Sequence, residues 1–324
     1  MSATFAGPRP DPVNASEACR YCGAALRIGT QPLHDTRFGI EQSYFHAYCP
    51  VCDLQQTCPR LSDADLKALY EQYYNFGGEA KTVRYSKWRE RFLFSRFYAL
   101  WTVLDGDISF HHVKGSGRLL DVGCNEGRGL LFYRHNGFAA EGLELNPAAA
   151  AAARQRGFTV STEALESFTP EHRYNVIILS NVLEHSQEPQ TMLAHVRRLL
   201  LPGGEVWISC PNARSWMRPL FRTRWVNWHI PFHTVHFSPG TLQTILRASG
   251  FRDVRIRQET PALWVASSLI VALFARHGRP TRQLRSTFWV GGLTLLTRLF
   301  AFPVLSLANH TGHGDCLVVR AVRD

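Results

Sequence analysis

Residues 117–257 predict an α/β fold in which helices cover both faces of a parallel sheet. Segments typical of strands alternate there with segments typical of helices, as in sheets built from strand–helix–strand units. The run Val-Ile-Ile-Leu at 176–179 is apolar at consecutive positions, which is typical of a central strand buried on both faces. Strands are expected at 118–123, 139–145, 158–162, 174–181, 204–210, 251–258 and 314–323, and helices after Gly127, Pro147, Pro189 and Pro239.

The composition is that of a globular protein with accessory parts. The chain has 324 residues, of which 45% are hydrophobic and 19% are charged, and this length exceeds that of most single domains. The first residues hold no apolar segment typical of a secretory signal, so we expect a cytoplasmic protein with reduced cysteines. The expected parts are a flexible tail (1–18), a cysteine-rich module (19–60), a helical linker or cap (61–114), the α/β core (115–260), an apolar helical insertion flanked by arginines (261–312) and a last core strand (313–324).

The cysteine-rich module holds two Cys-x-x-Cys pairs. Cys19 and Cys22 form the first pair, Cys49 and Cys52 the second, and 26 residues separate them. Each pair can present two thiolates to one ion, and four thiolates in tetrahedral geometry suit structural Zn²⁺. His46 and Cys58 lie nearby as substitute ligands, and a redox role for either pair is the alternative. The remaining cysteines, Cys124, Cys210 and Cys316, lie in or beside expected strands, where burial is the simpler interpretation.

The linker is expected to be helical. Ser62 is a candidate N-cap, and Leu66, Leu69 and Tyr73 follow at helical spacing. An aromatic-rich segment at 88–104 predicts a second helix that packs on a larger body.

The turn between the first strand and first helix of the core is a candidate ligand site. It runs from Asp121 to Gly127, at the carboxyl end of a strand, where open α/β sheets bind ligands. A dinucleotide site would need a third glycine where Asn125 stands, and the acid before Gly123 would repel a pyrophosphate. That acid suits an amino group, and Glu144, at the end of the second strand, suits the two hydroxyls of a ribose. An adenosyl amino acid fits both acids.

Three segments, Asp-Val-Gly-Cys-Asn-Glu-Gly (121–127), Gly-Leu-Glu-Leu-Asn-Pro (142–147) and the strand end at 175–185, resemble successive motifs of class I S-adenosylmethionine-dependent methyltransferases. The resemblance spans about residues 115–258 and implies a Rossmann-like seven-stranded sheet. Asn125 departs from the usual glycine, although asparagine tolerates left-handed backbone. The resemblance implies S-adenosylmethionine as cofactor and the binding residues Asp121, Gly123, Cys124, Asn125, Gly127, Glu144, Leu145, Asn181, Val182 and Leu183.

Three histidines are candidate catalytic groups. His185 follows the fourth strand, and His233 and His236 lie in an aromatic segment before the last core helix. Transfer of a methyl group to a hydroxyl or carbon benefits from a base whose pKa is near neutrality, and imidazole is such a base. Trp225, Trp228 and Phe232 in the same segment are candidates for a sugar-binding or lipid-binding face. A purely structural hydrogen-bonding role is the alternative for each histidine.

The apolar tract near the C-terminus predicts two helices lying on a membrane surface. The run at 261–275 is too short to span a bilayer, and the run at 286–309 is interrupted by Arg298 and Pro303. The arginines expected to face phosphates are Arg276, Arg279, Arg282, Arg285 and Arg298. A helical cap over the acceptor pocket, a dimer interface and a true membrane span are the alternatives for 261–308.

The positive charge is concentrated in the same part of the chain. The formal net charge is +10, with −2 over residues 1–196 and +12 over residues 197–324. This asymmetry indicates an anionic partner, namely a membrane, a phosphorylated substrate or nucleic acid. A solvated arginine-rich face is the alternative. Only four lysines are present, and aliphatic runs separate the arginines, which disfavours nucleic acid.

A cysteine module, a helical linker and a methyltransferase core together resemble bacterial methyltransferases of surface-polysaccharide and sugar-nucleotide pathways, including sugar C-methyltransferases. One group of ribosomal RNA methyltransferases is similar more loosely. We therefore predict methyl transfer to an oxygen or carbon of a glycan, sugar-nucleotide or lipid-linked acceptor, at the inner face of the membrane. The alternatives are an RNA methyltransferase and a non-catalytic membrane-associated protein; the oligomeric state stays open.

Overall fold

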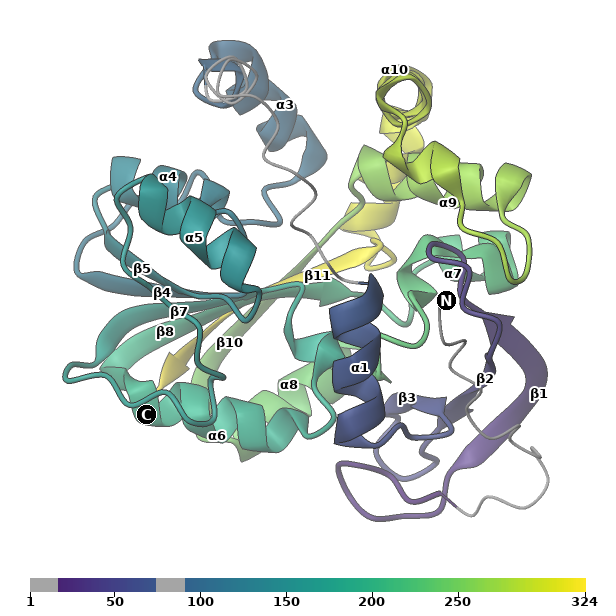
Figure 1. The fold of residues 1–324 in the computed structure, drawn as a ribbon, viewed down its shortest axis with the longest axis horizontal. Coiled ribbons are helices and arrows are strands. Elements are labelled where there is room, and N and C mark those ends of the chain that lie inside the picture. The colour runs from purple at the N-terminus through teal and green to yellow at the C-terminus, as the bar shows by residue number, and fades with distance from the viewer. Residues whose placement is uncertain (1–16, 74–90) are drawn as a thin grey trace.

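The computed structural model describes residues 17–73 and 91–324. Its core is a seven-stranded sheet with the order β10-β11-β8-β7-β4-β5-β6 (Figure 1). The strands are β4 (Arg118–Val122), β5 (Ala139–Leu143), β6 (Val160–Ser161), β7 (Tyr174–Ser180), β8 (Leu200–Pro211), β10 (Phe251–Glu259) and β11 (Cys316–Arg323). All seven expected strands are confirmed.

The sheet is mixed rather than wholly parallel. The pairs among β6, β5, β4, β7 and β8 are parallel, whereas β11 runs antiparallel to both β8 and β10. Glu259 at the end of β10 pairs with Cys316 at the start of β11. The segment between them therefore leaves and re-enters at the same edge of the sheet, which reverses β11.

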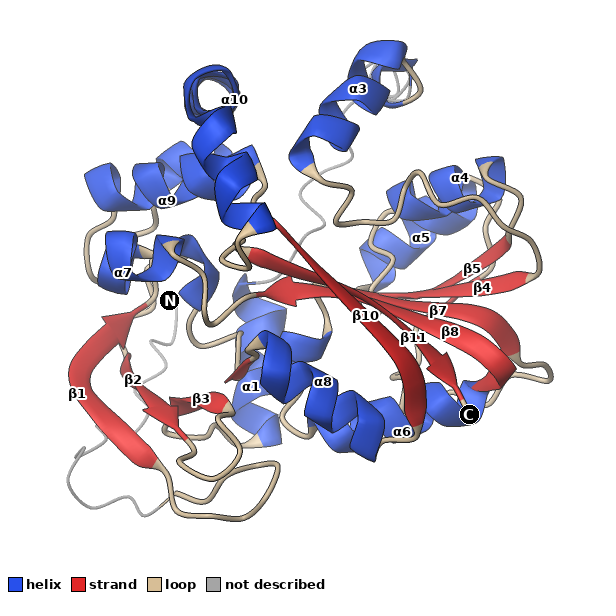
Figure 2. Cartoon of the chain, turned by 180° about the vertical axis from the view of Figure 1, so that it is seen from behind, coloured by secondary structure: helices blue, strands red, loops and turns tan. Residues whose placement is uncertain are grey.

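Helices cover both faces of the sheet, as expected. Figures 1 and 2 show α4 (Arg128–His135) and α5 (Pro147–Gln155) on one face and α6 (Pro189–Leu199) and α8 (Pro239–Ala248) on the other. Asn146 and Ser238 cap α5 and α8 by accepting hydrogen bonds from backbone amides, and proline begins both helices. Successive residues of β4 point to opposite faces of the sheet, so Leu119 belongs to the core cluster on one face and Leu120 to the cluster on the other.

The N-terminal module forms a second, four-stranded sheet that the core completes. Strands β1 (Arg27–His34), β2 (Ser43–Tyr48) and β3 (Gln55–Cys58) come from the module, and β9 (Val235–His236) comes from the core. Gln55 pairs with His236, and Gln56 with Val235. The module therefore shares a sheet with the histidine-containing segment of the core.

The linker contains helices α1 (Asp63–Tyr73) and α3 (Arg96–Asp105). The Ser62 hydroxyl accepts a hydrogen bond from the Asp65 amide, as expected for an N-cap, and Leu66 and Leu69 are buried. No residue of α3 is buried. The expected tail at 1–16 and the linker residues 74–90 lie outside the described residues.

The C-terminal insertion consists of α9 (Ala262–Phe274) and α10 (Thr287–His310). The two helices expected in this tract are present, and α10 is continuous through Arg298 and Pro303, the two residues that interrupt its apolar run in the sequence. Proline removes one backbone donor but its φ is helical, so the helix tolerates it at this cost. By length and composition α10 could cross a membrane, with a mean hydropathy of 1.6 in its most apolar window, of which 22% is buried. Shorter helices are η1 (Leu183–His185), α7 (Met217–Phe221), η2 (Arg222–Arg224), η3 (Val226–Trp228) and η4 (Arg282–Arg285).

Candidate functional site

A cavity of about 360 Å³ lies at the carboxyl end of β4. Parallel strands direct their loops to this edge, so residues distant in sequence converge there. The cavity is lined by Ser109, His111, Asp121, Gly123, Cys124, Asn125, Glu126, Arg128, Gly129, Tyr133 and Ser180. Four of the residues expected to bind the cofactor are therefore among its walls.

The turn after β4 has the left-handed backbone that its sequence predicts. Gly123, Asn125 and Gly127 have φ of 75°, 53° and 76°. Asparagine is one of the few non-glycine residues that adopt such values readily, so Asn125 replaces a glycine without breaking the turn. Gly127 has a further reason to be glycine, because a Cβ there would lie 2.9 Å from the Cβ of Ala153.

Asp121 and Glu144 carry the negative charge of this site. Asp121 is 6% exposed, and burial together with the charge of Glu144 raises its pKa to about 8. Glu144 accepts hydrogen bonds from the backbone amides of Asn125, at 2.9 Å, and Asn146, at 2.8 Å. These two bonds fix the carboxylate and leave lone pairs for further donors.

The residues after β5 and β7 take different positions. Leu145 is 67% exposed, and Leu183 is fully buried in the core. Asn181 has a left-handed φ of 55°, and its amide donates to the Ser209 carbonyl at 2.8 Å. Val182 is half-buried, and its side chain lies 3.2 Å from where a Cβ on Gly123 would sit. Leu183 can therefore reach a ligand only through its backbone.

His111 and Tyr133 line the cavity and were not among the predicted residues. His111 stacks on Phe132 with a ring separation of 4.2 Å, and its buried Nδ1 has no hydrogen-bond partner among the described residues. Burial, with a smaller effect of Arg128, lowers the pKa of His111 to about 3. Tyr133 donates to the Ser109 carbonyl at 2.8 Å. The position of Tyr133 on the predicted helix α4, next to the turn, could have indicated that it lines the cavity. His111 lies in an irregular segment, where the sequence pattern gives no such indication.

A second group of polar residues contains three histidines. His185, His229 and His233 each place one ring nitrogen within 4.8 Å of those of the other two. The Tyr70 hydroxyl lies 2.7 Å from Nδ1 of His185, and Nδ1 of His233 lies 2.8 Å from the Asn227 carbonyl. We call these three residues the histidine cluster. His229 was not predicted.

The histidine cluster is uncharged at neutral pH, and a buried acid adjoins it. Burial, with a smaller effect of Arg37, lowers the pKa of His185 to about 4 and holds that of His229 well below its ordinary value. Glu184 is 1% exposed, and burial raises its pKa to about 8. Its Oε1 lies 3.9 Å from Nε2 of His233, and neither carboxylate oxygen has a hydrogen-bond partner among the described residues.

His236 lies apart from the histidine cluster. It belongs to β9, and its Nε2 lies 3.2 Å from the Thr57 hydroxyl, which donates to the His233 carbonyl. The predicted aromatic binding face is wrong, because Trp225, Trp228 and Phe232 are 0%, 6% and 0% exposed. The indoles of the two tryptophans donate to Asp315 and to the Arg222 carbonyl, so they serve the core.

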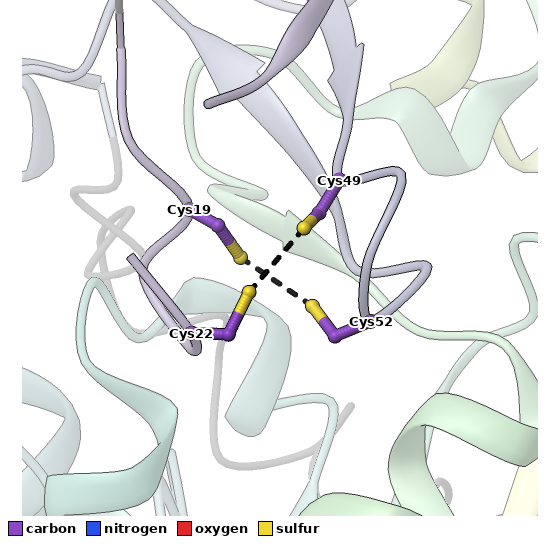
Figure 3. Close-up of side chains that lie close together, drawn as sticks. All are labelled: Cys19, Cys22, Cys49 and Cys52. Carbon is purple, nitrogen blue, oxygen red and sulfur yellow. Dashed lines mark hydrogen bonds between the residues drawn. The ribbon is translucent and has the colours of Figure 1, made fainter. Parts of the chain in front are cut away.

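The four cysteines of the N-terminal module converge (Figure 3). Their Sγ atoms all lie within 4.8 Å of one another. Cys19 and Cys52 are 3.5 Å apart, and Cys22 and Cys49 are 3.4 Å apart. Tetrahedral Zn²⁺ with bonds of about 2.3 Å needs sulfur separations of about 3.8 Å, so the cluster fits this ion. The two substitute ligands are engaged elsewhere, since Cys58 contacts Glu17 and His46 contacts Gln55.

Comparison with known proteins agrees with this geometry. A family model described as "Methyltransferase domain" matches residues 85–256. The chain belongs to this methyltransferase family. Its strand order, with an antiparallel seventh strand, and its class I motifs are those of the S-adenosylmethionine-dependent type.

Curated relatives of the methyltransferase match part of its length. The ubiquinone biosynthesis O-methyltransferase of Cereibacter sphaeroides is 31% identical over 42% of this chain and 61% of its own. Its namesake in Pectobacterium atrosepticum is 28% identical over 35% of this chain and 52% of its own. The chain thus spans between half and two thirds of these relatives. A solved S-adenosylmethionine-dependent methyltransferase from Archaeoglobus fulgidus has 20% identity and a TM-score of 0.45, over 74% of this chain and 99% of that chain.

Four of the five arginines that were predicted to face lipid phosphates are exposed, and the fifth is not. Arg276, Arg279, Arg282 and Arg285 are exposed. Arg298 is 7% exposed; it forms an ion pair with Asp105 and donates to the Leu104 carbonyl. The prediction that Arg298 faces phosphates is therefore wrong, because α3 covers it.

Proposed function

We propose that the protein transfers the methyl group of S-adenosylmethionine to a hydroxyl oxygen of a lipid-linked small molecule at a membrane surface. The observation that carries the proposal is the pair of acids at neighbouring strand ends, Asp121 in the cavity and Glu144 fixed by two backbone amides. The cofactor supplies an electrophilic methyl group when bound. Family membership supports methyl transfer, and the names of the curated relatives support oxygen as the acceptor atom.

The cavity residues fit the cofactor by charge. Burial, with a further contribution from the charge of Glu144, raises the pKa of Asp121, and a cationic amino group beside it would offset both effects. We assign the Glu144 carboxylate to the two ribose hydroxyls, because two backbone amides hold it and leave it further acceptor positions, and we assign the exposed Leu145 to packing on an adenine ring. We assign Gly123, Cys124, Asn125 and Gly127 to the methionine end, and the backbone of 181–183 to the side of the cofactor nearest β7.

We assign the acceptor side to the histidine cluster. His185 follows β7 at the carboxyl edge of the sheet, and its imidazole is neutral at working pH. With a pKa of about 4, this imidazole is a weaker base than the sequence predicts, but it can accept the proton of the hydroxyl once methylation has made that proton strongly acidic. His236 contacts Thr57 within the shared sheet, so we assign it a positioning role.

The exposed apolar helices support a membrane-associated acceptor. Phe97, Leu100 and Val103 on α3 are 58–66% exposed, and Phe288 and Phe300 on α10 are both 78% exposed. Figures 1 and 2 show α3 and α10 projecting on the same side of the sheet. Exposed arginines at 276–285 add charge that complements anionic lipid headgroups. We propose that the side of the protein carrying α3 and α10 lies on the inner membrane surface. In this arrangement neither helix spans the membrane.

The test is methyl transfer from labelled S-adenosylmethionine into separated fractions of a bacterial extract. The proposal expects label in the organic-soluble lipid fraction and release on cleavage of methyl ethers. Label in glycans or sugar nucleotides would support the alternative acceptors from the sequence, and label in RNA would overturn the lipid assignment. Absence of S-adenosylmethionine binding by calorimetry would overturn the proposed activity itself.

A further inference from the structure

The histidine cluster has the composition and spacing of a metal site, and the buried Glu184 adjoins it. Three imidazoles gather within 4.8 Å, measured between one nitrogen of each. A tetrahedral ion with bonds of about 2.1 Å needs ligand nitrogens about 3.4 Å apart. Nδ1 of His229 and Nε2 of His233 already lie 3.3 Å apart, so only a small shift of His185 is required.

The surroundings fix the direction of these ligands. Nδ1 of His233 faces the Asn227 carbonyl at 2.8 Å and must carry the proton of that ring, which leaves Nε2 as an electron-pair donor. The Tyr70 hydroxyl contacts Nδ1 of His185 at 2.7 Å and orients the second ring. A carbonyl or hydroxyl on the far nitrogen is the usual arrangement around metal-ligating histidine.

Glu184 can supply the negative charge that such a site needs once a bound ion displaces the proton of its carboxyl group. Its carboxylate is buried, with Oε1 3.9 Å from Nε2 of His233, the nitrogen that also contacts Nδ1 of His229. Both its oxygens lack a hydrogen-bond partner among the described residues, and a buried carboxylate without a partner is costly. A cation between this carboxylate and the imidazoles would satisfy it.

We propose that His185, His229, His233 and Glu184 bind a divalent transition-metal ion at the acceptor side of the methyltransferase. Three neutral imidazoles and one carboxylate suit Zn²⁺, Co²⁺ or Fe²⁺ rather than Mg²⁺ or Ca²⁺, which prefer oxygen. This inference rests on the proposed function only for the ion's role. The inference adds to the proposed function in this respect: an ion held by these imidazoles would lower the pKa of an acceptor hydroxyl, and this effect would replace proton removal by a histidine base.

The test is the metal content of the full chain, combined with Co²⁺ spectroscopy. The four-cysteine site is expected to bind one ion, so the proposal expects a second equivalent in the wild type. In the variant H229Q/H233Q this second equivalent is lost and the first remains. In protein whose cysteine site is filled with Zn²⁺, added Co²⁺ gives visible ligand-field bands without the charge-transfer band that thiolates produce.

The matched control is His236→Gln, which changes a buried histidine of the same segment outside the cluster. It should retain both equivalents. Glu184→Gln, with its similar shape, should weaken Co²⁺ binding by about tenfold or more, since it removes the charge but not the volume. Circular dichroism establishes that the variants fold. One equivalent in the wild type, or a second that persists in H229Q/H233Q, overturns the proposal; calorimetry with S-adenosylmethionine reports separately on the proposed function.

Discussion

Glu144 combines a fixed carboxylate with free acceptor positions, because two backbone amides hold it at 2.8–2.9 Å. If these free positions bind the ribose, Glu144→Gln lowers the affinity for S-adenosylmethionine by about 10- to 100-fold, since hydrogen bonds to a charged group contribute about 1.5–3 kcal/mol. Isothermal titration calorimetry measures the loss. Glu163→Gln, at an exposed position after β6, should bind like the wild type; equal affinity in all three proteins would contradict the assignment.

Asp121 predicts a pH dependence of stability. In the unfolded chain its carboxyl has its ordinary pKa of 3.8, whereas burial, with the charge of Glu144, raises the pKa in the folded protein to about 8. The folded cofactor-free protein thus binds more protons between about pH 4 and pH 8, and its stability falls as pH rises through that window. Asp121→Asn removes this penalty, so its Tm should exceed that of the wild type by several degrees at pH 8.5.

The same comparison at pH 5 is the control for Asp121→Asn. There the wild-type carboxyl is largely protonated in the folded protein, so the difference in Tm should shrink. Thermal unfolding followed by circular dichroism at the two pH values measures both quantities. The variant should also lose the thermal shift caused by S-adenosylmethionine. A difference in Tm that does not change with pH would contradict the assigned cause.

Individual residues differ in how far the sequence predicted them. The left-handed turn at Asn125 followed from its position between two glycines, because backbone geometry is local. The burial of Trp225 and Trp228 did not follow, since it depends on Asp315 and on a carbonyl of another helix. The position of Asp315, ninety residues further along the chain, has no local signal.

At the level of elements, strands and helices of the core were predictable because their apolar periodicity is strong. The two-residue strand β9 was not, because its signal lies in pairing with β3 and not in its own composition. The helix α10 was expected, but its full length does not follow from composition alone, because Arg298 and Pro303 interrupt its apolar run. Arg298 lies within the helix because Asp105 on α3 offsets its charge.

The cysteine module predicts a loss of metal on substitution of one ligand. Cys22→Ser should lose one equivalent of Zn²⁺ per chain and lower the Tm, because ion binding contributes directly to folding of such modules. Since β3 pairs with β9, the loss should also destabilise the core, and unfolding should remain a single transition. Metal analysis and calorimetry measure the two effects.

Cys58→Ser is the matched control for this element. Cys58 is buried near the module's cysteines but donates to Glu17 at 3.0 Å instead of joining the four. It should keep the full zinc content. Loss of the same equivalent from Cys58→Ser, or its retention in Cys22→Ser, would show that the four cysteines are not the ligand set.

Across the whole molecule, charge and apolar surface are placed together. The +12 of residues 197–324 includes the four exposed arginines between α9 and α10. The Arg298–Asp105 pair joins α10 to α3, so the exposed apolar residues of both helices belong to one side of the protein. Composition alone could not indicate that Arg298 is covered by α3 while the four arginines between α9 and α10 are exposed, because this depends on the contact between α10 and α3. In the membrane association proposed above, the arginines on this surface would attract anionic lipid and the phenylalanines would insert.

These two contributions are separable by substitution. Each arginine near an anionic surface contributes about 1 kcal/mol, so R279Q/R282Q/R285Q should weaken binding to phosphatidylglycerol-containing vesicles by about 100-fold and remove most of its salt dependence. F288S/F300S should weaken binding by a similar or larger factor, since burial of each phenylalanine contributes about 1.5–3 kcal/mol, and should leave the salt dependence intact.

The control variant is R198Q/R247Q, whose substitutions lie on α6 and α8 across the sheet. It makes a similar change in charge and should bind normally. Vesicle co-sedimentation at two salt concentrations measures all four proteins, and wild-type protein that stays in the supernatant would refute the membrane surface.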